Sequence, residues 1–536
     1  SWHPAELGRG DRGEEDDVKG SRLLIWGMAL CVAVAFAGAI GVILTVFDHN
    51  EHMYLAAGVQ VTQNKVIYRD FAYLQMPYLP LLYGKLLQWL PIQAYYLLAG
   101  KVVSCFFLGL SAATLFLIGR RVLGQLAPAL GIVALFLLNM TIIGPAAEVS
   151  NYIAPLALSL LSFYAFLVST DQARVKSLGL ALSGFCLALA IGSKLTYAPT
   201  VVPFLIALGR LPVENGTPAA ALRYRLTHGL APFMGGLALG LLPLVGYLFD
   251  WDRFLFNNLG YHALNTQWRL LTGYAGAMSV AARLDFARQI LTRTDNLILI
   301  AGVLLAIGLS LGRFAGQRPT GRRLPSGALL AMLLFLVAVP TALAPAPSFF
   351  QYFALPVSCL FLLLIYAWAP HAAADFRWRR VLLPMLVLVS VAFSGPGLQR
   401  SITRLLDPQT WSGVYVHQVA MSIRQALETA GVGPTGKIAT LSPVYVIEAN
   451  LPIYPQLATG PFLFRVGDLL TPAQRQRFVG ASPQTVHELL DADPPVAILV
   501  GFEGDLDASL RDYAKQHNYA QQDTLAGGAE LYIRPP

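Results

Sequence analysis

Long apolar segments constrain this chain more than any other feature of its sequence. Residues 23–47 carry no charged side chain, and a helix rising about 1.5 Å per residue needs about 20 residues to cross a hydrocarbon core. Similar segments recur as far as residue 397, and only 13% of the whole sequence is charged. Since backbone polar groups in lipid must be satisfied within a helix, the sequence predicts an α-helical polytopic membrane protein.

The apolar segments indicate about 11 transmembrane helices. They lie at 23–47, 94–118, 126–144, 151–169, 177–193, 195–209, 228–249, 295–312, 326–345, 349–369 and 381–397. After Leu398 the character changes, and residues 400–536 are expected to form a soluble α/β domain. Its predicted strands lie at 437–441, 496–500 and 530–533, and its helices lie near 414–430, 483–491 and 506–517.

The distribution of Lys and Arg predicts the orientation of the chain. Every second connection is basic, and basic connections are typical of the cytoplasmic side. These connections hold Arg120, Arg121, Arg174, Lys176, Arg210, Arg223, Arg225, Arg313, Arg318, Arg322, Arg323, Arg377, Arg379 and Arg380. The net charge of +8 is therefore explained without a nucleic-acid partner.

This orientation predicts three parts. We expect a cytoplasmic tail at 1–22, a transmembrane domain at 23–399, and the domain at 400–536 on the outer side. The outer loops are expected at 48–93, 144–150 and 250–294. The most fitting location is a bacterial inner membrane, with the outer side facing the periplasm.

Two carboxylates lie at the outer end of the first apolar segment. Asp48 is the first charged residue after it, and Glu51 follows near the start of a predicted helix over 51–62. An enzyme that deprotonates a hydroxyl at the edge of a membrane needs a carboxylate held there. The alternative is that Asp48 or Asn50 only caps the following helix. This stretch alone leaves both interpretations open.

Basic residues also lie on the predicted outer side, where the positive-inside rule disfavours them. Arg69 and Lys85 in the first outer loop are either ordinary surface charges or contacts to a phosphate group near the membrane. Arg269 in the third outer loop is a further candidate, because a guanidinium can hold a phosphate with two parallel hydrogen bonds.

Lys194 lies in a turn between two short apolar segments, 177–193 and 195–209. Both are shorter than a usual span, so the turn is expected to sit below the outer surface. A lysine facing lipid at that depth costs about 2.5–3.5 kcal/mol. We therefore expect Lys194 to face a cavity and an anion, with snorkelling to the interface as the alternative.

The first outer loop carries a family resemblance. An acidic residue ends the first span, a segment with Tyr54 and Ala56-Ala57-Gly58 follows, and Val66-Ile67-Tyr68-Arg69-Asp70-Phe71 precedes Pro77. This pattern resembles the C-type (GT-C) glycosyltransferase superfamily, and within it the protein mannosyltransferase and the aminoarabinose and galacturonic acid transferase families. The resemblance implies a GT-C fold and transfer of a sugar from a polyprenyl-phosphate carrier to an acceptor at the outer face.

The resemblance also implies roles for other residues. Glu148 matches an acidic position that helps to hold a divalent cation or the substrate, and Gln351 and Tyr352 match a polar–aromatic pair opening a late span. With Asp48 and Glu51, Glu148 could supply oxygen ligands for Mg²⁺, Mn²⁺ or Ca²⁺. A solvated loop carboxylate and a plain interfacial aromatic pair are the alternatives. This chain departs from some members at Met76, where they place a basic residue before the proline.

Together these observations predict an inverting glycosyltransferase with Asp48 as the general base. Lys194, Arg69, Lys85, Arg269, Gln351 and Tyr352 would bind the donor phosphate or the substrate, and Glu148 and Glu51 would hold any metal. The acceptor would be a glycolipid such as lipopolysaccharide, a polysaccharide or a protein, and the transferred sugar a hexose or a pentose. The alternative is a transporter or flippase of lipid-linked saccharides, which would favour repeated halves with broken helices.

Overall fold

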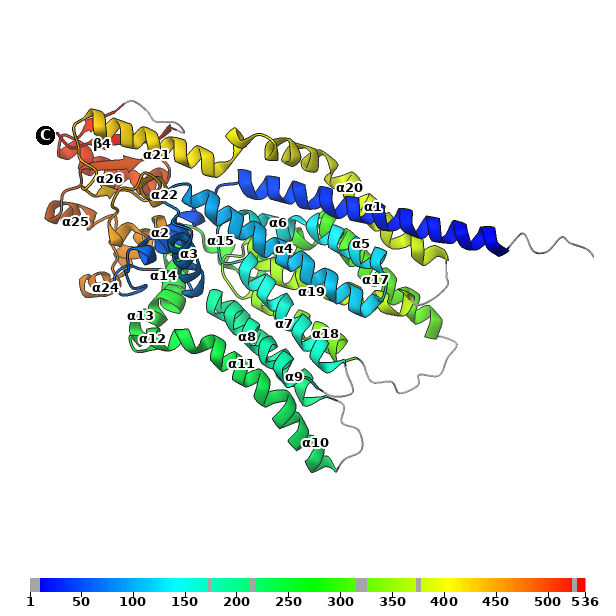
Figure 1. The fold of residues 1–536 in the computed structure, drawn as a ribbon. Coiled ribbons are helices and arrows are strands. Elements are labelled where there is room, and N and C mark those ends of the chain that lie inside the picture. The colour runs from blue at the N-terminus through cyan, green and yellow to red at the C-terminus, as the bar shows by residue number, and fades with distance from the viewer. Residues whose placement is uncertain are drawn as a thin grey trace, which may run out of the picture.

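The computed structural model describes residues 10–171, 175–211, 217–314, 325–372, 377–522 and 528–535. Arg174, Arg318, Arg322 and Arg323, on which part of the predicted orientation depends, lie outside the described residues, as do residues 1–9 of the predicted tail. Figure 1 shows a bundle of long helices with a mixed helix and strand region at one end.

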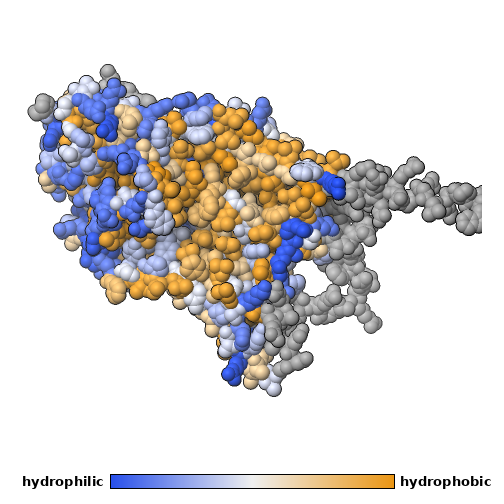
Figure 2. Space-filling view, in the orientation of Figure 1, coloured by the Kyte–Doolittle hydropathy of each residue, from blue (hydrophilic) through white to orange (hydrophobic). Residues whose placement is uncertain are grey.

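The bundle consists of helices of unequal length. They are α1 (Gly10–Thr45), α4 (Tyr96–Leu123), α5 (Leu126–Leu137), α6 (Met140–Ala147), α7 (Ile153–Thr170), α8 (Ser177–Ser193), η1 (Leu195–Thr200), α9 (Val201–Gly209), α10 (Pro218–Tyr224), η2 (Arg225–Leu230), α11 (Ala231–Leu241), η3 (Leu242–Leu244), α12 (Val245–Leu248), α17 (Thr294–Phe314), α18 (Ser326–Leu343), η5 (Phe350–Phe353), α19 (Ala354–Ala372) and α20 (Arg377–Leu405). Figure 2 shows a broad hydrophobic surface over this bundle, beside a hydrophilic end.

The helices show a multi-pass membrane protein. Within the described residues, 7 helices are long and apolar enough to cross a membrane, and up to 9 if the bent pairs α5–α6 and α16–α17 are one span each. Two shorter apolar helices, at 177–193 and 195–209, lie where spans were expected. The predicted total of about 11 spans stays a prediction.

Small residues let α8 and α11 pack closely. A Cβ added at Gly236 would lie 1.8 Å from the carbonyl oxygen of Ala181, and one at Gly184 would lie 2.0 Å from that of Phe233. Only glycine permits these approaches, which is the usual way that helices pack where lipid offers no hydrophobic driving force.

Short helices cover the end of the bundle that meets the C-terminal region. They are α2 (Asn50–Thr62), α3 (Tyr78–Trp89), α13 (Trp251–Leu255), η4 (Phe256–Gly260), α14 (Tyr261–Leu271), α15 (Ala275–Met278) and α16 (Val280–Leu291). They belong to the predicted outer loops 48–93 and 250–294.

Helix α4 begins beside the C-terminal region. At its other end, Arg121 pairs with Asp171 at 2.9 Å and joins the last turns of α4 and α7. Arg120 and Arg121 thus lie at the end of α4 away from the C-terminal region, and the assignment of the ends to cytoplasm and periplasm stays a prediction.

The C-terminal region, defined here as residues 406–535, contains a small mixed sheet. Its elements are η6 (Pro408–Thr410), α21 (Ser412–Thr429), β1 (Ile438–Ala439), α22 (Pro443–Glu448), η7 (Pro455–Leu457), α23 (Pro461–Val466), η8 (Gly467–Leu469), α24 (Pro472–Arg477), α25 (Val486–Ala492), β2 (Ala497–Val500), η9 (Gly504–Asp507), α26 (Ala508–Gln516), β3 (Ala520–Gln521) and β4 (Glu530–Ile533). The strand order is β1-β2-β4-β3, with β1 parallel to β2 and the other pairs antiparallel.

The sheet lies close to where the sequence predicts strands, and β3 is an addition. Helix α20 continues to Leu405, so the predicted domain boundary at residue 399 falls inside a helix. The C-terminal region packs on the bundle rather than standing apart. Ser412 Oγ donates to the carbonyl of Leu44 at 3.0 Å, and the rings of Phe256 and Phe478 stack 3.7 Å apart.

Candidate active site

Asp48 lies in the short link between α1 and α2, where it is half-buried. Its Oδ1 accepts a hydrogen bond from the backbone N–H of Asn50 at 2.8 Å, so one oxygen does help to start α2. Its Oδ2 makes no hydrogen bond to the part of the chain that the structure describes. One carboxylate oxygen therefore helps to start the helix, and the other has no hydrogen-bond partner in the described chain.

Glu51 is fully buried and paired with Lys101 of α4, which is also 0% exposed. Glu51 Oε1 also accepts from the backbone N–H of Val149 at 2.6 Å, and Oε2 accepts from that of Asp48 at 3.1 Å. Lys101 Nζ donates further to the carbonyls of Val46 at 2.8 Å and Ala147 at 2.6 Å. The pair thus joins the end of α1, the start of α2, α4 and the α6–α7 link.

Lys101 was not singled out from the sequence, although it is the single charge in the predicted span 94–118. An isolated charge within a span is itself a signal, because its burial is costly without a partner. The periodicity of an apolar helix does not identify that partner.

Glu148 follows α6 and lies beside the same link. Its Oε2 accepts from Asn50 Nδ2 at 3.3 Å. Burial, together with the nearby carboxylates of Asp48 and Glu51, raises the pKa of Glu148 to about 8. The structure therefore brings Asp48, Glu51 and Glu148 together, and we call these three residues the outer carboxylate group.

The outer carboxylate group does not have the form of a metal site. Within the described residues, no three His, Cys, Asp or Glu side chains are placed to hold a metal ion. Both oxygens of Glu51 already accept hydrogen bonds from Lys101, Val149 and Asp48. The predicted role of Glu148 and Glu51 in holding a divalent cation stays a prediction.

Lys194 ends α8 and is 7% exposed. Its Nζ lies 3.2 Å from the ring centroid of Tyr152 and donates to Asn151 Oδ1 at 3.2 Å. The same oxygen accepts from Tyr54 OH at 2.8 Å. No carboxylate lies within ion-pair distance of Lys194 in the described chain. Lys194 faces protein groups rather than snorkelling, and its charge has no direct counter-ion there.

Asn151 connects Lys194 to the first outer loop. Besides accepting from Tyr54 and Lys194, it donates from Nδ2 to Gln75 Oε1 at 3.0 Å and to the carbonyl of Ser193 at 3.3 Å. It follows Glu148 by three residues, so the carboxylate group and the lysine share one link between α6 and α7. Asn151 gave no signal in the sequence, because a lone Asn in a loop has many ordinary roles.

Gln351 and Tyr352 of η5 lie on the other side of Lys194. They line a small cavity together with Lys194 and Tyr152, and Lys194 Nζ lies 5.9 Å from the Tyr352 ring centroid. Arg269 of α14 reaches the same segment, with its guanidinium 5.5 Å from the Phe349 ring. The predicted residues Lys194, Gln351 and Tyr352 therefore do converge, and Arg269 approaches them.

Arg69 and Lys85 make no contact with Lys194, Gln351, Tyr352 or Arg269 in the described chain. Both are exposed. Arg69 pairs with Asp70 at 2.9 Å, and Lys85 donates to Gln88 Oε1 at 3.2 Å. Their predicted phosphate contacts stay predictions, and the ordinary surface role fits the geometry more simply.

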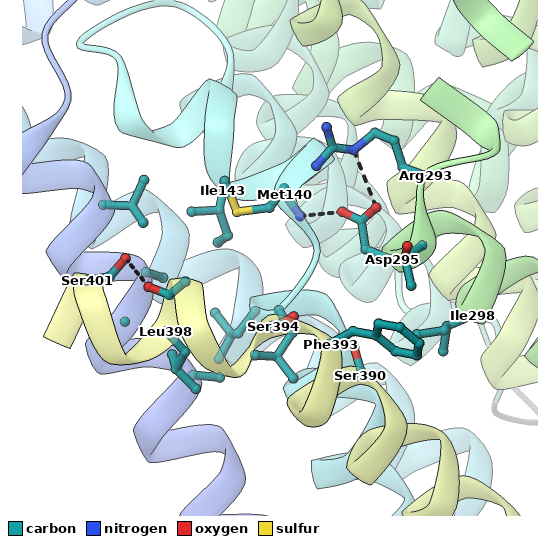
Figure 3. Close-up of a pocket in the computed structure, with 18 residues that line it drawn as sticks. Met140, Ile143, Arg293, Asp295, Ile298, Ser390, Phe393, Ser394, Leu398 and Ser401 are labelled. Atoms are coloured by element: carbon teal, nitrogen blue, oxygen red, sulfur yellow. Dashed lines mark hydrogen bonds and ion pairs between the residues drawn. The ribbon is translucent and has the colours of Figure 1, made fainter. Parts of the chain in front are cut away.

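A separate cavity of about 500 Å³ lies among α1, α5–α6, α17 and α20. Figure 3 shows Arg293 and Asp295 at one side and Ser390, Phe393, Ser394, Leu398 and Ser401 of α20 at the other. The Arg293 guanidinium also lies 5.2 Å from the Phe350 ring, so η5 lies between this cavity and the Lys194 cavity. Most of the lining of this cavity is apolar, which suits a hydrocarbon chain, while Arg293, Asp295 and the serines make part of it polar.

Solved structures share this fold. ArnT from Cupriavidus metallidurans in the apo state aligns with a TM-score of 0.57 at 13% identity, over 96% of this chain and 98% of ArnT. The same protein bound to undecaprenyl phosphate aligns with a TM-score of 0.58 at 13% identity, again over 96% and 98%. AglB from Archaeoglobus fulgidus, in complex with an inhibitory peptide and a dolichol-phosphate, gives a TM-score of 0.48 at 12% identity over 95% and 74%.

The sequence itself has no such match: no protein-family model and no curated protein matches it. The alignment with ArnT, a GT-C glycosyltransferase, spans nearly the whole of both chains. It confirms the resemblance drawn from the first outer loop at the level of the fold.

Proposed function

We propose that this protein is an inverting glycosyltransferase that moves a sugar from a polyprenyl-phosphate donor to a cell-envelope acceptor on the outer side of the membrane. The observation that carries the proposal is that Asp48 and Lys194 both lie beside the link between α6 and α7. Asp48 has an unengaged carboxylate oxygen, and Lys194 is a buried cation without a carboxylate partner in the described chain. The shared fold with an ArnT that binds undecaprenyl phosphate supports a polyprenyl-phosphate donor.

In this proposal Asp48 Oδ2 takes the proton from the acceptor hydroxyl. The acceptor oxygen forms a bond with the anomeric carbon, while the bond from that carbon to the phosphate oxygen breaks on the opposite face. The lipid phosphate leaves with an added negative charge. Lys194 and Arg269 stabilise this charge as it develops, which is where fixed cations contribute most to rate.

The two cavities suggest a place for the donor. The phosphate would lie near Lys194, Gln351 and Tyr352, and part of the polyprenyl chain would lie in the cavity beside α20. The first turn of η5 lies between them. The sugar would then face Asp48 and the outer carboxylate group. The proposed sugar is a hexose or a pentose, and lipopolysaccharide is one proposed acceptor. The transfer assay described next tests both.

The test is transfer by the purified protein from a panel of undecaprenyl-phosphate sugars to extracted envelope glycolipid. We expect transfer by the wild type and a loss of at least about a hundredfold in Asp48→Asn, which cannot accept the proton. Asp285→Asn is the control, because this exposed carboxylate lies on α16 and pairs with Arg288. A chelator arm tests metal dependence. Equal transfer by Asp48→Asn would refute the assigned base, and donor binding without transfer would favour a transporter.

A further inference from the structure

Arg465, on α23 of the C-terminal region, lies against the third outer loop. Its Nη2 donates to the hydroxyl of Tyr261 on α14 at 3.2 Å. Its guanidinium lies between two aromatic rings, with its Cζ 5.2 Å from the centroids of both Trp268 and Phe462. Helices α14 and α23 pack together. The arginine is held in place by neutral groups on three sides.

Arg465 and Arg269 each have a guanidinium N–H without a hydrogen-bond partner in the described chain. In each arginine it is the Nε–H, which is buried. Neither guanidinium forms an ion pair with a carboxylate in that part of the chain. Buried donors are nearly always paired, so these two guanidinium donors are open to a partner from outside the protein, either water or a ligand group.

The two guanidinium groups are also close enough to affect each other. Burial and the charge of Arg465 lower the pKa of Arg269. Glu503 makes no ion pair with Arg465 in the described chain. The charge of Arg465 lowers the pKa of Glu503, but burial outweighs it and raises that pKa to about 8. Near neutral pH that group is mostly protonated and does not offset the two arginines. Two like charges held together favour an anion between them.

We propose that Arg465 and Arg269 together bind one phosphate group of a substrate, so that the C-terminal region completes the active site. This inference rests on the proposed function. A planar guanidinium presents parallel N–H donors that match phosphate oxygens, and two of them can hold a phosphate from two sides. Trp268, Phe462, Phe349 and Tyr274 flank the pair and keep both planes fixed. Arg465 is a binding residue in this proposal, and Asp48 remains the base.

The phosphate has two sources: the polyprenyl-phosphate donor and a phosphorylated acceptor. The test titrates the full-length protein in detergent with undecaprenyl phosphate, with lipid A and with dephosphorylated lipid A, and compares wild type with Arg465→Gln. We expect Arg465→Gln to raise the half-saturating concentration about ten- to a hundredfold for one phosphorylated ligand, as for loss of charge-assisted hydrogen bonds. A change with undecaprenyl phosphate identifies the donor, and a change with lipid A alone identifies the acceptor.

Two further variants separate the charge from the fold. Arg465→Lys keeps the charge without the fork and should fall between wild type and Arg465→Gln. Arg424→Gln, an exposed arginine paired with Glu428 on α21, should bind as the wild type does. If Arg465→Gln melts well below the wild type, Arg465→Lys carries the test. Wild-type binding of every ligand by both Arg465 variants overturns the inference. Failure of the wild type to transfer sugar would instead overturn the proposed function, whatever the Arg465 variants bind.

Discussion

Asp48 and Glu51 are close in sequence but have different surroundings, and these surroundings divide their roles. Glu51 is enclosed and has donors on both oxygens, whereas Asp48 keeps Oδ2 without a hydrogen bond to the described chain. Glu51 also accepts from the backbone N–H of Asp48. In the proposed reaction Glu51 is thus a positioning residue for Asp48, and its partner Lys101 acts through it.

Removing one member of the Glu51–Lys101 pair should be strongly destabilising. In Lys101→Met, Glu51 stays buried without its counter-ion, and we expect a loss of about 3–5 kcal/mol in the free energy of unfolding. The double variant Glu51→Gln with Lys101→Met should recover part of this loss, because no unpaired charge remains. Denaturant unfolding in detergent measures both, with Lys515→Met, an exposed lysine on α26, as the control. Equal losses in Lys101→Met and the control would contradict the pair's importance.

The carboxyl of Glu148 should make stability depend on pH. Its pKa is raised from 4.5 to about 8 by burial and by Asp48 and Glu51, so between these values the folded state holds a proton that the unfolded state has released. Stability from this group is complete below about pH 4.5 and is lost as the pH rises through about 8.

We therefore expect the melting temperature to fall between pH 5 and pH 8, and Glu148→Gln to flatten that fall because its side chain does not titrate. The pKa of Glu503 is also raised to about 8, so Glu503 makes the melting temperature fall over the same pH range. This part of the fall should remain in Glu148→Gln. Differential scanning calorimetry at several pH values makes the comparison. An unchanged slope in Glu148→Gln would show that Glu148 is not buried as a neutral acid.

At the scale of the elements, two bent helix pairs meet through a buried polar cluster. Helices α5 and α6 are bent by 56° around Asn139, and α16 and α17 by 78° before Asn296. Asn139 Nδ2 donates to Asn296 Oδ1 at 2.9 Å, and Asn296 Nδ2 donates to Thr141 Oγ1 and to the carbonyl of Ile290, both at 2.8 Å. A break within an apolar region leaves backbone groups unpaired, and this cluster satisfies some of them.

Asn296→Leu should destabilise the protein because it keeps the side-chain size and removes these hydrogen bonds. The Nδ2 group of Asn139 would be left buried without its acceptor, at about 1–3 kcal/mol, whereas the carbonyl of Ile290 would keep the backbone N–H of Arg293 at 3.2 Å. The melting temperature in detergent tests this, with Gln267→Leu on the exposed face of α14 as a control of similar chemistry. A melting temperature for Asn296→Leu equal to that of the control would mean that the cluster does not support the bends.

At the scale of the whole molecule, Glu448 fastens the C-terminal region to the membrane bundle. This carboxylate is 1% exposed and accepts from the backbone N–H groups of Tyr95 and Tyr96, where α4 begins. Tyr95 has φ +58°, a left-handed conformation that is unfavourable for a tyrosine. His417 Nδ1 lies 2.6 Å from Glu448 Oε1, and its ring stacks on that of Tyr95 at 4.0 Å. A negative charge at a helix N-terminus is favourable in itself.

Glu448→Ala should loosen this attachment. We expect a loss of about 1–3 kcal/mol from the unpaired N–H groups of Tyr95 and Tyr96, and faster cleavage by trypsin after Arg400 or Arg404 at the end of α20. Electrophoresis of timed digests gives the rate, and Glu428→Ala on the exposed side of α21 is the control. If the C-terminal region completes the site through Arg465, Glu448→Ala should also weaken phosphate binding. Digestion at the wild-type rate would contradict the attachment.

The sequence by itself determined the membrane character and the approximate positions of the apolar helices and strands, and it singled out Asp48 and Lys194 as candidates whose roles stay predictions. These follow from local properties: the length and hydropathy of a segment, and a charge at its end. The resemblance in the first outer loop agrees with the shared fold. Lys194, Gln351 and Tyr352 were each predicted separately as substrate contacts, and the structure places all three in the lining of one cavity.

Only the tertiary structure decided which charges are paired and which have no ion-pair partner in the described chain. Glu51 meets Lys101 from 50 residues away, and Arg465 meets Tyr261 from 204 residues away. No hydropathy pattern encodes such contacts, because they depend on how helices distant in sequence pack together. The same packing leaves Arg69 and Lys85 exposed with local partners. It also places Arg465 of the C-terminal region against Tyr261 and Trp268 of α14.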